Sequence, residues 1–220
     1  RCRLIGNWGN WGQTTILRAI SWSVPIGALQ SGTMQKAETT RSLYEQLVDL
    51  PETLTGELLN GQLHTQPRPT PRHLHAVSRL DRTIGRGYGD GVDGPGGWWI
   101  LIEPEIHFVR DTEIAVPDLA GWRRDRLPSL PETAYFEIAP DWVCEILSPS
   151  TASKDREIKM PLYARHGVSH AWIIDPQAHS LEAFELRDDT WSLIQTFSED
   201  DSVAVAPFAE LAIELAEFWI

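Results

Sequence analysis

Cysteine is scarce in this chain of 220 residues, which contains only Cys2 and Cys144. Two cysteines so far apart in the sequence exclude a disulfide framework and a cysteine-based zinc cluster. Long apolar runs are also missing, since no stretch of about 18 consecutive apolar residues, the length that crosses a bilayer, is present. We therefore expect a cytoplasmic protein that does not enter the membrane.

Basic residues are the second shortage. The chain has 19 Lys and Arg against 31 Asp and Glu, which gives a formal net charge of −12. This balance argues against broad, nonspecific attraction to nucleic acid. A nucleic-acid-binding function therefore requires a local basic patch.

Acidic residues are absent from residues 1–33, which hold three of the ten Trp and three Arg. Because the composition changes at this point, we expect 1–33 to be a disordered N-terminal extension and 34–220 to be a single domain that starts at Met34. A signal peptide is a competing interpretation of the extension. It is the weaker one because Arg18 and several polar residues interrupt the apolar region.

The segment at residues 142–147 is apolar at both alternating sets of positions, except at Glu145. This pattern predicts a central strand that is covered on both faces. A carboxylate in such a strand is costly to bury unless a cation or several hydrogen-bond donors meet it. We therefore expect a positive group close to Glu145.

Asp118 and Lys159 are the candidates for a site shared with Glu145. Asp118 continues the alternation of Ile114 and Val116, so a strand there directs its carboxylate inward. Lys159 follows S-P-S-T, a helix-starting sequence, and its ammonium is expected to reach back to the strand end. Two acids and a lysine at one sheet edge form a hard-oxygen site for a divalent metal, with a cation beside it.

Several motifs occur in order along the chain: G-E-L-L-N-G-Q-L (56–63), P-R-H (71–73), P-D (117–118), E-I-L-S-P-S-T (145–151), D-x-x-x-K (155–159), Y-A-R-H-G-V (163–168) and W-I-I-D-P (172–176). Together they resemble the bacterial Uma family of restriction endonucleases, within the PD-(D/E)xK nuclease superfamily. The resemblance extends from about residue 42 to residue 208. It implies an α/β fold of the restriction-endonuclease type, in which a mixed central β-sheet is flanked by helices.

The resemblance also implies roles for the candidate residues. Asp118 and Glu145, with the carbonyl of Ile146, are expected to hold Mg²⁺, for which Mn²⁺ can substitute. Lys159 is expected to orient or deprotonate the attacking water, and Glu57 to be a further metal ligand. Asp118, Glu145 and Lys159 are thus the expected catalytic residues.

One departure from the superfamily pattern concerns the lysine. The (D/E)-x-K triplet places lysine two residues after Glu145, but this chain has Leu147 there. Lys159, in the following helix, is the matching residue. Pro161 removes a backbone donor close by, so we expect that helix to be kinked or frayed.

Glu57 and His73 each have a structural alternative. Glu57 precedes Asn60-Gly61, a dipeptide that predicts a hairpin between strands at 56–59 and 62–66, and it is equally well an exposed strand residue. His73 matches the family's P-x-H position, which makes it a candidate site residue. Its position on the apolar side of a helix is also typical of a hydrogen-bonded core histidine.

Residues 71–86 predict a helix with two distinct faces. At about 100° per residue, a basic ridge forms on one side, while Leu74, Val77, Leu80 and Ile84 fall opposite. The ridge consists of Arg72, His75, Arg79, Arg82 and Arg86. We expect its four arginines to bind DNA phosphates and to supply the local patch that the acidic composition lacks. The alternative is a solvated charged face.

The remaining segments predict the elements around the site. Glycine and proline predict an exposed loop at 85–97, and a polar loop at 123–140 is expected near the catalytic end. The other expected elements are a helix at 43–50, a meander of strands at 98–103, 105–109 and 113–116, a strand at 170–175, a hairpin at 181–186 and 191–197, and a capping helix at 208–220.

The resemblance implies a Mg²⁺-dependent endodeoxyribonuclease that hydrolyses phosphodiester bonds in DNA. Cutting both strands favours a homodimer. One alternative is a catalytically silent nuclease-like module that binds DNA or a protein, and another is a structural ion pair of Glu145 and Lys159, with Asp118 capping a turn. A glycosidase that uses the two acids is a third, but it leaves Lys159 and the basic ridge unexplained.

Overall fold

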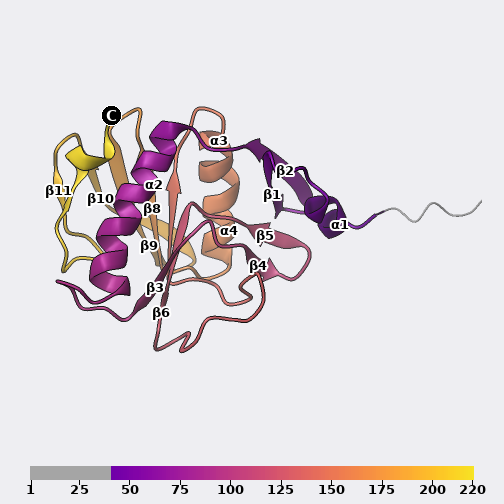
Figure 1. Cartoon of the computed structure of the whole chain (residues 1–220), viewed down its shortest axis with the longest axis horizontal. Coiled ribbons are helices and arrows are strands. Elements are labelled where there is room, and N and C mark those ends of the chain that lie inside the picture. The colour runs from indigo at the N-terminus through magenta and orange to yellow at the C-terminus, as the bar shows by residue number, and fades with distance from the viewer. Residues whose placement is uncertain (1–40) are drawn as a thin grey trace, which may run out of the picture. The chain divides into compact units, whose positions relative to one another are not determined.

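The computed structural model describes residues 41–220 of the chain, so the expected extension at 1–33 lies outside the described residues (Figure 1). The α-helices are α1 (Leu43–Val48), α2 (Pro71–Ile84), α3 (Ala152–Lys154) and α4 (Met160–Arg165). The π-turns are η1 (Gly85–Gly89) and η2 (Asp155–Lys159), and η3 (Leu215–Phe218) is a 3-10 turn. Within 41–220, no helix is long and apolar enough to cross a bilayer.

The larger sheet has six strands in the order β10-β9-β8-β7-β6-β3. These are β3 (Trp98–Ile102), β6 (Leu119–Arg123), β7 (Trp142–Ile146), β8 (His170–Asp175), β9 (Ser180–Arg187) and β10 (Thr190–Ser198). β7 and β8 run parallel and the other neighbours run antiparallel, so the sheet is mixed. The predicted α/β fold with a mixed sheet flanked by helices is confirmed.

A second sheet has four strands in the order β2-β1-β5-β4. These are β1 (Leu54–Leu59), β2 (Gln62–Pro67), β4 (Ile106–Val109) and β5 (Glu113–Ala115). Asn60 and Gly61 join β1 to β2 with φ values of 51° and 72°, as a tight hairpin turn requires, so the predicted hairpin is confirmed. Two short strands, β11 (Ser202–Val203) and β12 (Ile213–Glu214), pair separately.

β7 lies inside the larger sheet, and all five of its residues are buried. Trp142 and Cys144 pack in the core on the α2 side of the sheet, whereas Val143 packs in the core on the α4 side. Because side chains alternate along a strand, Glu145 shares the side of Val143. The prediction of a central strand is confirmed, and it directs Glu145 toward the helix that carries Lys159.

α2 covers one face of the larger sheet (Figure 1). The Thr70 side chain caps its N-terminus by accepting a hydrogen bond from the His73 backbone N–H. The buried stripe of the helix is centred on His73, Val77 and Leu80. Leu74, which was expected on this stripe, lies about 100° from it and is 50% exposed, so its predicted burial is wrong.

The predicted loop at 85–97 is wrong in its first five residues, where η1 continues α2 as a π-turn. Tyr88 explains the extra turn. Its buried ring lies edge-on to Phe208 at 4.7 Å, and its hydroxyl oxygen accepts a hydrogen bond from the Glu210 backbone N–H. Local glycine content indicated a loop, but this packing against the C-terminal segment stabilises a helical turn.

The predicted meander into the site is wrong. β3 belongs to the six-stranded sheet, while β4 and β5 belong to the four-stranded sheet. β5 ends at Ala115, and Asp118 lies in the link before β6, a strand that the sequence analysis missed. Asp118 therefore owes its orientation to the crossing between two sheets and not to alternation along a strand.

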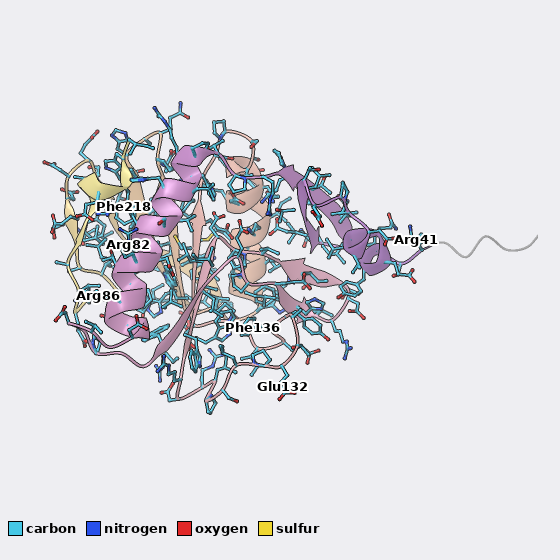
Figure 2. All side chains as sticks on the ribbon, in the orientation of Figure 1. Arg41, Arg82, Arg86, Glu132, Phe136 and Phe218 are labelled. Carbon is cyan, nitrogen blue, oxygen red and sulfur yellow. The ribbon has the colours of Figure 1, made fainter. Side chains whose placement is uncertain are left out.

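The loop at 124–140 joins β6 to β7. Because β6 and β7 are antiparallel, with Leu119 opposite Cys144, Asp118 lies at one end of this pair and the loop at the other. The loop runs along the bottom of Figure 1, and Figure 2 labels Glu132 and Phe136 within it. Its predicted position near the catalytic end is therefore wrong.

The C-terminal segment forms β12 and η3 in place of most of the predicted capping helix. Ile213 is buried and pairs with Val203, and this pairing holds the segment in an extended conformation. The predicted short helix (α1), the strand at 170–175 (β8) and the hairpin (β9 and β10) are confirmed.

Candidate active site

Glu145 is buried in β7, and both of its carboxylate oxygens have protein donors. The Lys159 ammonium nitrogen lies 2.8 Å from the carboxylate. The Tyr163 hydroxyl donates to the second oxygen. A cation thus meets Glu145, as its position in a covered strand required.

Lys159 reaches Glu145 from η2, and its own side chain is only 2% exposed. Its ammonium lies 3.0 Å from the Glu57 carboxylate and donates to the Val116 carbonyl at 3.1 Å. Together with Glu145, these acceptors match the three N–H bonds of an ammonium. Asp155 adds a further carboxylate at 3.9 Å. Lys159 therefore connects three segments: β1, β7 and the link that leads into β6.

The turn that carries Lys159 departs from a regular α-helix. η2 is a π-turn between α3 and α4, and Pro161 lies in the first turn of α4. A residue with no backbone N–H removes one helical hydrogen bond, which accounts for a wider turn immediately before it. The predicted irregularity near Pro161 is confirmed.

Glu57 is fully buried in β1, so the alternative of an exposed strand glutamate is wrong. One carboxylate oxygen accepts from the Val116 backbone N–H at 2.9 Å. The other pairs with Lys154, which also donates to Gln66 of β2. Two lysines therefore neutralise the acids that the fold brings together here.

The charges of this cluster determine its pKa shifts. Burial raises the pKa of Glu145 well above its usual value, and the neighbouring acids raise it further against the effect of Lys159. Burial alone would raise the pKa of Glu57, but Lys159 and Lys154 lower it. Burial would likewise lower the pKa of Lys159, but Glu145 and Glu57 raise it well above its usual value. The acids of the cluster therefore favour the charged form of Lys159, while burial opposes the charged form of Glu145.

Asp118 lies next to this cluster, with 14% of its side chain exposed. One carboxylate oxygen accepts from the Ile146 backbone N–H at 2.7 Å, and the other lies 2.9 Å from His73 Nε2. Burial would lower the pKa of His73, but its bond to Asp118 raises it. His73 is thus hydrogen-bonded to a candidate site residue as well as buried, which unites the two interpretations of this histidine.

A pocket of about 70 Å³ opens in front of Asp118 and His73. Arg68, Glu103 and Ser148 also line it. Arg68 is exposed, and no hydrogen bond or ion pair of its side chain is found within the described residues. The pocket therefore offers solvent access to the Asp118 carboxylate and places an arginine at its mouth.

The oxygen atoms at this site are of the type that divalent cations prefer. Asp118 and Glu145 supply carboxylate oxygens, and Ile146, the last residue of β7, supplies a backbone carbonyl. The carboxylate oxygens hold protein donors in this arrangement. Among residues 41–220, no group of three or more His, Cys, Asp or Glu side chains is positioned to hold a metal ion. Metal binding at Glu145 therefore requires the hydrogen bond from Lys159 or Tyr163 to open.

The buried Glu145–Lys159 pair is the geometry that the structural alternative describes. In contrast to that alternative, Asp118 bonds across to β7 and α2 and does not cap a turn of its own segment. The geometry brings Asp118, Glu145, Lys159, Glu57 and His73 into one connected network. It leaves the four arginines of the predicted ridge outside that network.

The predicted basic ridge is partly neutralised. Arg79 pairs with Glu217, and Arg86 pairs with Asp93 at 2.5 Å. Arg72 and Arg82 are exposed and have no ion pair within the described residues. Two of the four arginines are thus paired with acids, Arg79 with one from the C-terminal segment and Arg86 with one from the loop that follows it. Phosphate binding by the ridge stays a prediction.

Sequence reasoning missed Lys154, Tyr163 and Arg68. Tyr163 lies four residues after Lys159, so helical spacing was a usable signal for it. Lys154 lies five residues before Lys159, a spacing that only the intervening π-turn brings onto one side. Arg68 stands between two prolines, an extended segment whose position beside Asp118 depends on contacts across the two sheets. No local pattern could have placed Arg68 there.

Two comparisons with known proteins find nucleases. The model of the Uma2 family, described as "Putative restriction endonuclease", matches residues 42–216. A crystal structure of a putative nuclease of DUF820 from Anabaena variabilis matches with a TM-score of 0.65 and 25% identity, over 80% of this chain and 96% of that one. No curated protein matches the chain. Both matches support nuclease function, and since the family model covers most of its length, the chain belongs to the Uma2 family.

Proposed function

We propose that this protein is a metal-dependent nuclease that hydrolyses phosphodiester bonds in DNA. The observation that carries the proposal is the position of Asp118. Its carboxylate lines an open pocket and bonds to the Ile146 backbone, one residue from the buried Glu145. The family supports a nuclease acting on DNA.

In this proposal, Asp118 and Glu145, with the Ile146 carbonyl, hold Mg²⁺, for which Mn²⁺ substitutes, and Glu57 stays behind them. When bound, a divalent cation lowers the pKa of a water molecule and neutralises charge that grows on the phosphate. His73 holds Asp118 in place through the 2.9 Å hydrogen bond. The two carboxylates remain anionic when the cation is present, because its charge offsets the burial of Glu145.

Lys159 and Arg68 have different roles in this proposal. Lys159 already has three acceptors, so it orients the attacking water only after its bond to Glu145 opens. Arg68, at the pocket mouth, binds the non-reacting phosphate oxygens as a planar donor. The buried lysine therefore organises the acids, and the exposed arginine meets the substrate.

The test is incubation of the purified protein with plasmid and with short oligonucleotides, in Mg²⁺, Mn²⁺ or EDTA. We expect cleavage with either metal and none in EDTA. Asp118→Asn should lower the cleavage rate by about a hundredfold or more. Asp200→Asn is the matched control, because Asp200 is exposed and lies outside the site. Cleavage by Asp118→Asn at the wild-type rate would remove the proposed site.

A catalytically silent module that binds DNA or a protein is the second candidate. The observation that favours it is the saturation of both Glu145 oxygens by Lys159 and Tyr163. In that case, oligonucleotides bind but stay intact in every metal, and Mg²⁺ leaves the melting temperature unchanged. Wild-type cleavage that Asp118→Asn abolishes would exclude this candidate.

The proposal extends to a homodimer, because two sites can cut both strands of a duplex at one place in a single binding event. Light scattering after size-exclusion chromatography, with and without a DNA duplex, tests this point. A monomer that nicks plasmid but does not linearise it would contradict the dimer without affecting the site.

A further inference from the structure

A groove of about 500 Å³ lies at the other end of α2 from the candidate active site. Side chains from α2, η1, β3 and the end of β6 line it: Arg82, Arg86, Arg124, Trp98, Trp99 and Asp81. β3 is the edge strand of the six-stranded sheet within residues 41–220. Because neighbouring strand residues face opposite sides, Trp98 and Trp99 indicate that the groove wraps around this free edge.

Arg124 and Trp99 form a stacked pair in the groove. The guanidinium carbon of Arg124 lies 4.0 Å from the centroid of the Trp99 ring. The same guanidinium donates to the Gly89 carbonyl at 2.9 Å, and the Trp99 indole N–H donates to the Leu127 carbonyl. These bonds hold both planar groups in fixed orientations, although Arg124 itself is exposed. The outer face of the guanidinium is therefore a ready stacking surface.

The charged groups around this stack are mixed in sign. Arg82 is exposed and has no ion pair within 41–220, whereas Arg86 is shared with Asp93 at 2.5 Å. Asp81 and Asp90 also line the groove, and partial burial beside Asp90 raises the pKa of Asp81. Figure 2 labels Arg82 and Arg86 on the C-terminal half of α2 and its continuation. Donors and acceptors thus stand close to one planar surface.

We propose that this groove binds an unpaired nucleotide of a nucleic-acid strand, with its base stacked on Arg124 and its phosphate on Arg82. Bases of single strands are recognised by stacking on aromatic rings and guanidinium planes, together with hydrogen bonds to their edges. A site for phosphate alone needs neither a stack nor carboxylates. Asp81 and Asp90 accept hydrogen bonds from the amino and imino groups of a base. A phosphate anion has no such donors and would be repelled by the carboxylates.

The position of the groove connects it to the candidate active site. Arg82 and Arg86 follow His73 by nine and thirteen residues, which corresponds to about 14 to 20 Å along a helix. The rise of a stacked strand is about 3.4 Å per nucleotide, and an unpaired strand can extend further per nucleotide. A strand with its phosphate beside Asp118 therefore spans the length of the helix to the groove in at most about four to six nucleotides. The inference rests on the proposed function only in taking nucleic acid as the ligand, and it assigns the groove a role in holding a flanking unpaired nucleotide.

The test is fluorescence anisotropy of a labelled oligothymidylate of about twelve nucleotides, long enough to span both places, in EDTA so that nothing is cleaved. Arg124→Ala should weaken binding about tenfold, the usual loss for one stacked base. Arg124→Lys, which keeps the charge but has no planar group, should weaken it nearly as much. Full affinity in Arg124→Lys would overturn the stacking, and full affinity in Arg124→Ala would overturn the site.

Three comparisons complete the design. Arg110→Ala removes an exposed arginine outside the groove and should leave the affinity within about twofold. Arg124→Ala should weaken the binding of a DNA duplex of equal length by less than about threefold, because the bases of a duplex stack on one another. If Arg124→Ala unfolds the domain by circular dichroism, Arg82→Ala, which removes no internal bond, carries the test with an expected loss of about threefold. An unchanged affinity in Arg82→Ala would then overturn the site.

The groove and the nuclease can fail separately. Asp118→Asn should still bind the oligothymidylate in a manner that depends on Arg124. If the wild type cuts no DNA but binding depends on Arg124, the proposed function fails and the groove stands. If the wild type cuts DNA and Arg124→Ala changes neither binding nor cleavage, the groove fails and the proposed function stands.

Discussion

Two charged regions of the domain differ in how their charges are satisfied. In the buried cluster of Glu57, Glu145, Lys154 and Lys159, each carboxylate has a lysine partner. In the groove around Arg124, one arginine stacks on a tryptophan, and Arg82 has no ion pair within the described residues. The first region faces the protein interior, and the second faces water.

This difference distinguishes charges that stabilise the folded state from charges that are available to bind a ligand. Burying an ion costs several kcal/mol of dehydration. When one member of a buried ion pair is removed, the charge of its partner stays buried with neither a counterion nor water. Exposed ions are screened, and single exposed pairs contribute about 0 to 1 kcal/mol. Mutations in the cluster should therefore act mainly on stability, and mutations in the groove mainly on binding.

The largest expected effect is that of Lys159→Met. The substitution leaves Glu57, Glu145 and Asp155 without their shared cation, so we expect a loss of about 3–5 kcal/mol in the free energy of unfolding. Urea unfolding measures it. Lys154→Met is the matched control and should cost less, because Lys154 is 15% exposed and Glu57 keeps Lys159. Equal losses would show that the two lysines share the load.

Glu145→Gln should have a smaller effect with a defined pH dependence. Lys159 keeps Glu57 at 3.0 Å, so the cation is not stranded. The folded state raises the pKa of Glu145, so stability from its protonation is present below the unfolded pKa and is lost as pH rises through the folded pKa. Gln cannot ionise and avoids this loss.

The stability of Glu145→Gln relative to the wild type should therefore rise as the pH increases from about 5, without metal. Unfolding curves across this range measure the difference. A variant that is less stable by about 3 kcal/mol at every pH, with an unchanged response to Mg²⁺, would identify Glu145 as a purely structural partner of Lys159.

Charge reversals on α2 sharpen the comparison further. Arg82→Glu should weaken oligonucleotide binding several-fold and flatten its salt dependence, because Arg82 is exposed and free of ion pairs within 41–220. Arg79→Glu should weaken binding less, since Arg79 is already paired with Glu217. Anisotropy titrations at two salt concentrations separate the two variants. Identical effects would show that Arg79 and Arg82 contribute equally to binding despite the Arg79–Glu217 ion pair.

The smallest expected effect is that of removing residues 1–33. A protein that begins at Met34 should melt within a degree or two of the full chain, because the family match covers only residues 42–216. Scanning calorimetry of the two proteins compares their melting temperatures. A drop of many degrees would show that the extension packs against the domain.

Much of the fold was predictable because its signals are local. The turn at Asn60-Gly61, the buried strand around Glu145 and the hairpin of β9 and β10 follow from residues that lie next to one another in the sequence. The failures share another cause. η1, β6 and the C-terminal segment owe their conformations to distant partners, such as Phe208 for Tyr88.

The candidate site divides in the same way. The sequence by itself determined that Glu145 sits in a covered strand and that its charged form needs a cation or several donors, because an ionised carboxylate among apolar neighbours is costly to bury. It also identified Asp118 from strand alternation and Lys159 from its place after a helix-starting sequence, and the resemblance to a family added Glu57. Only the tertiary structure decided that Lys159 is saturated by three acceptors and that Lys154 is the second cation. Hydrogen bonds and ion pairs depend on distances of a few ångströms between segments far apart in the chain, and no local sequence pattern encodes them.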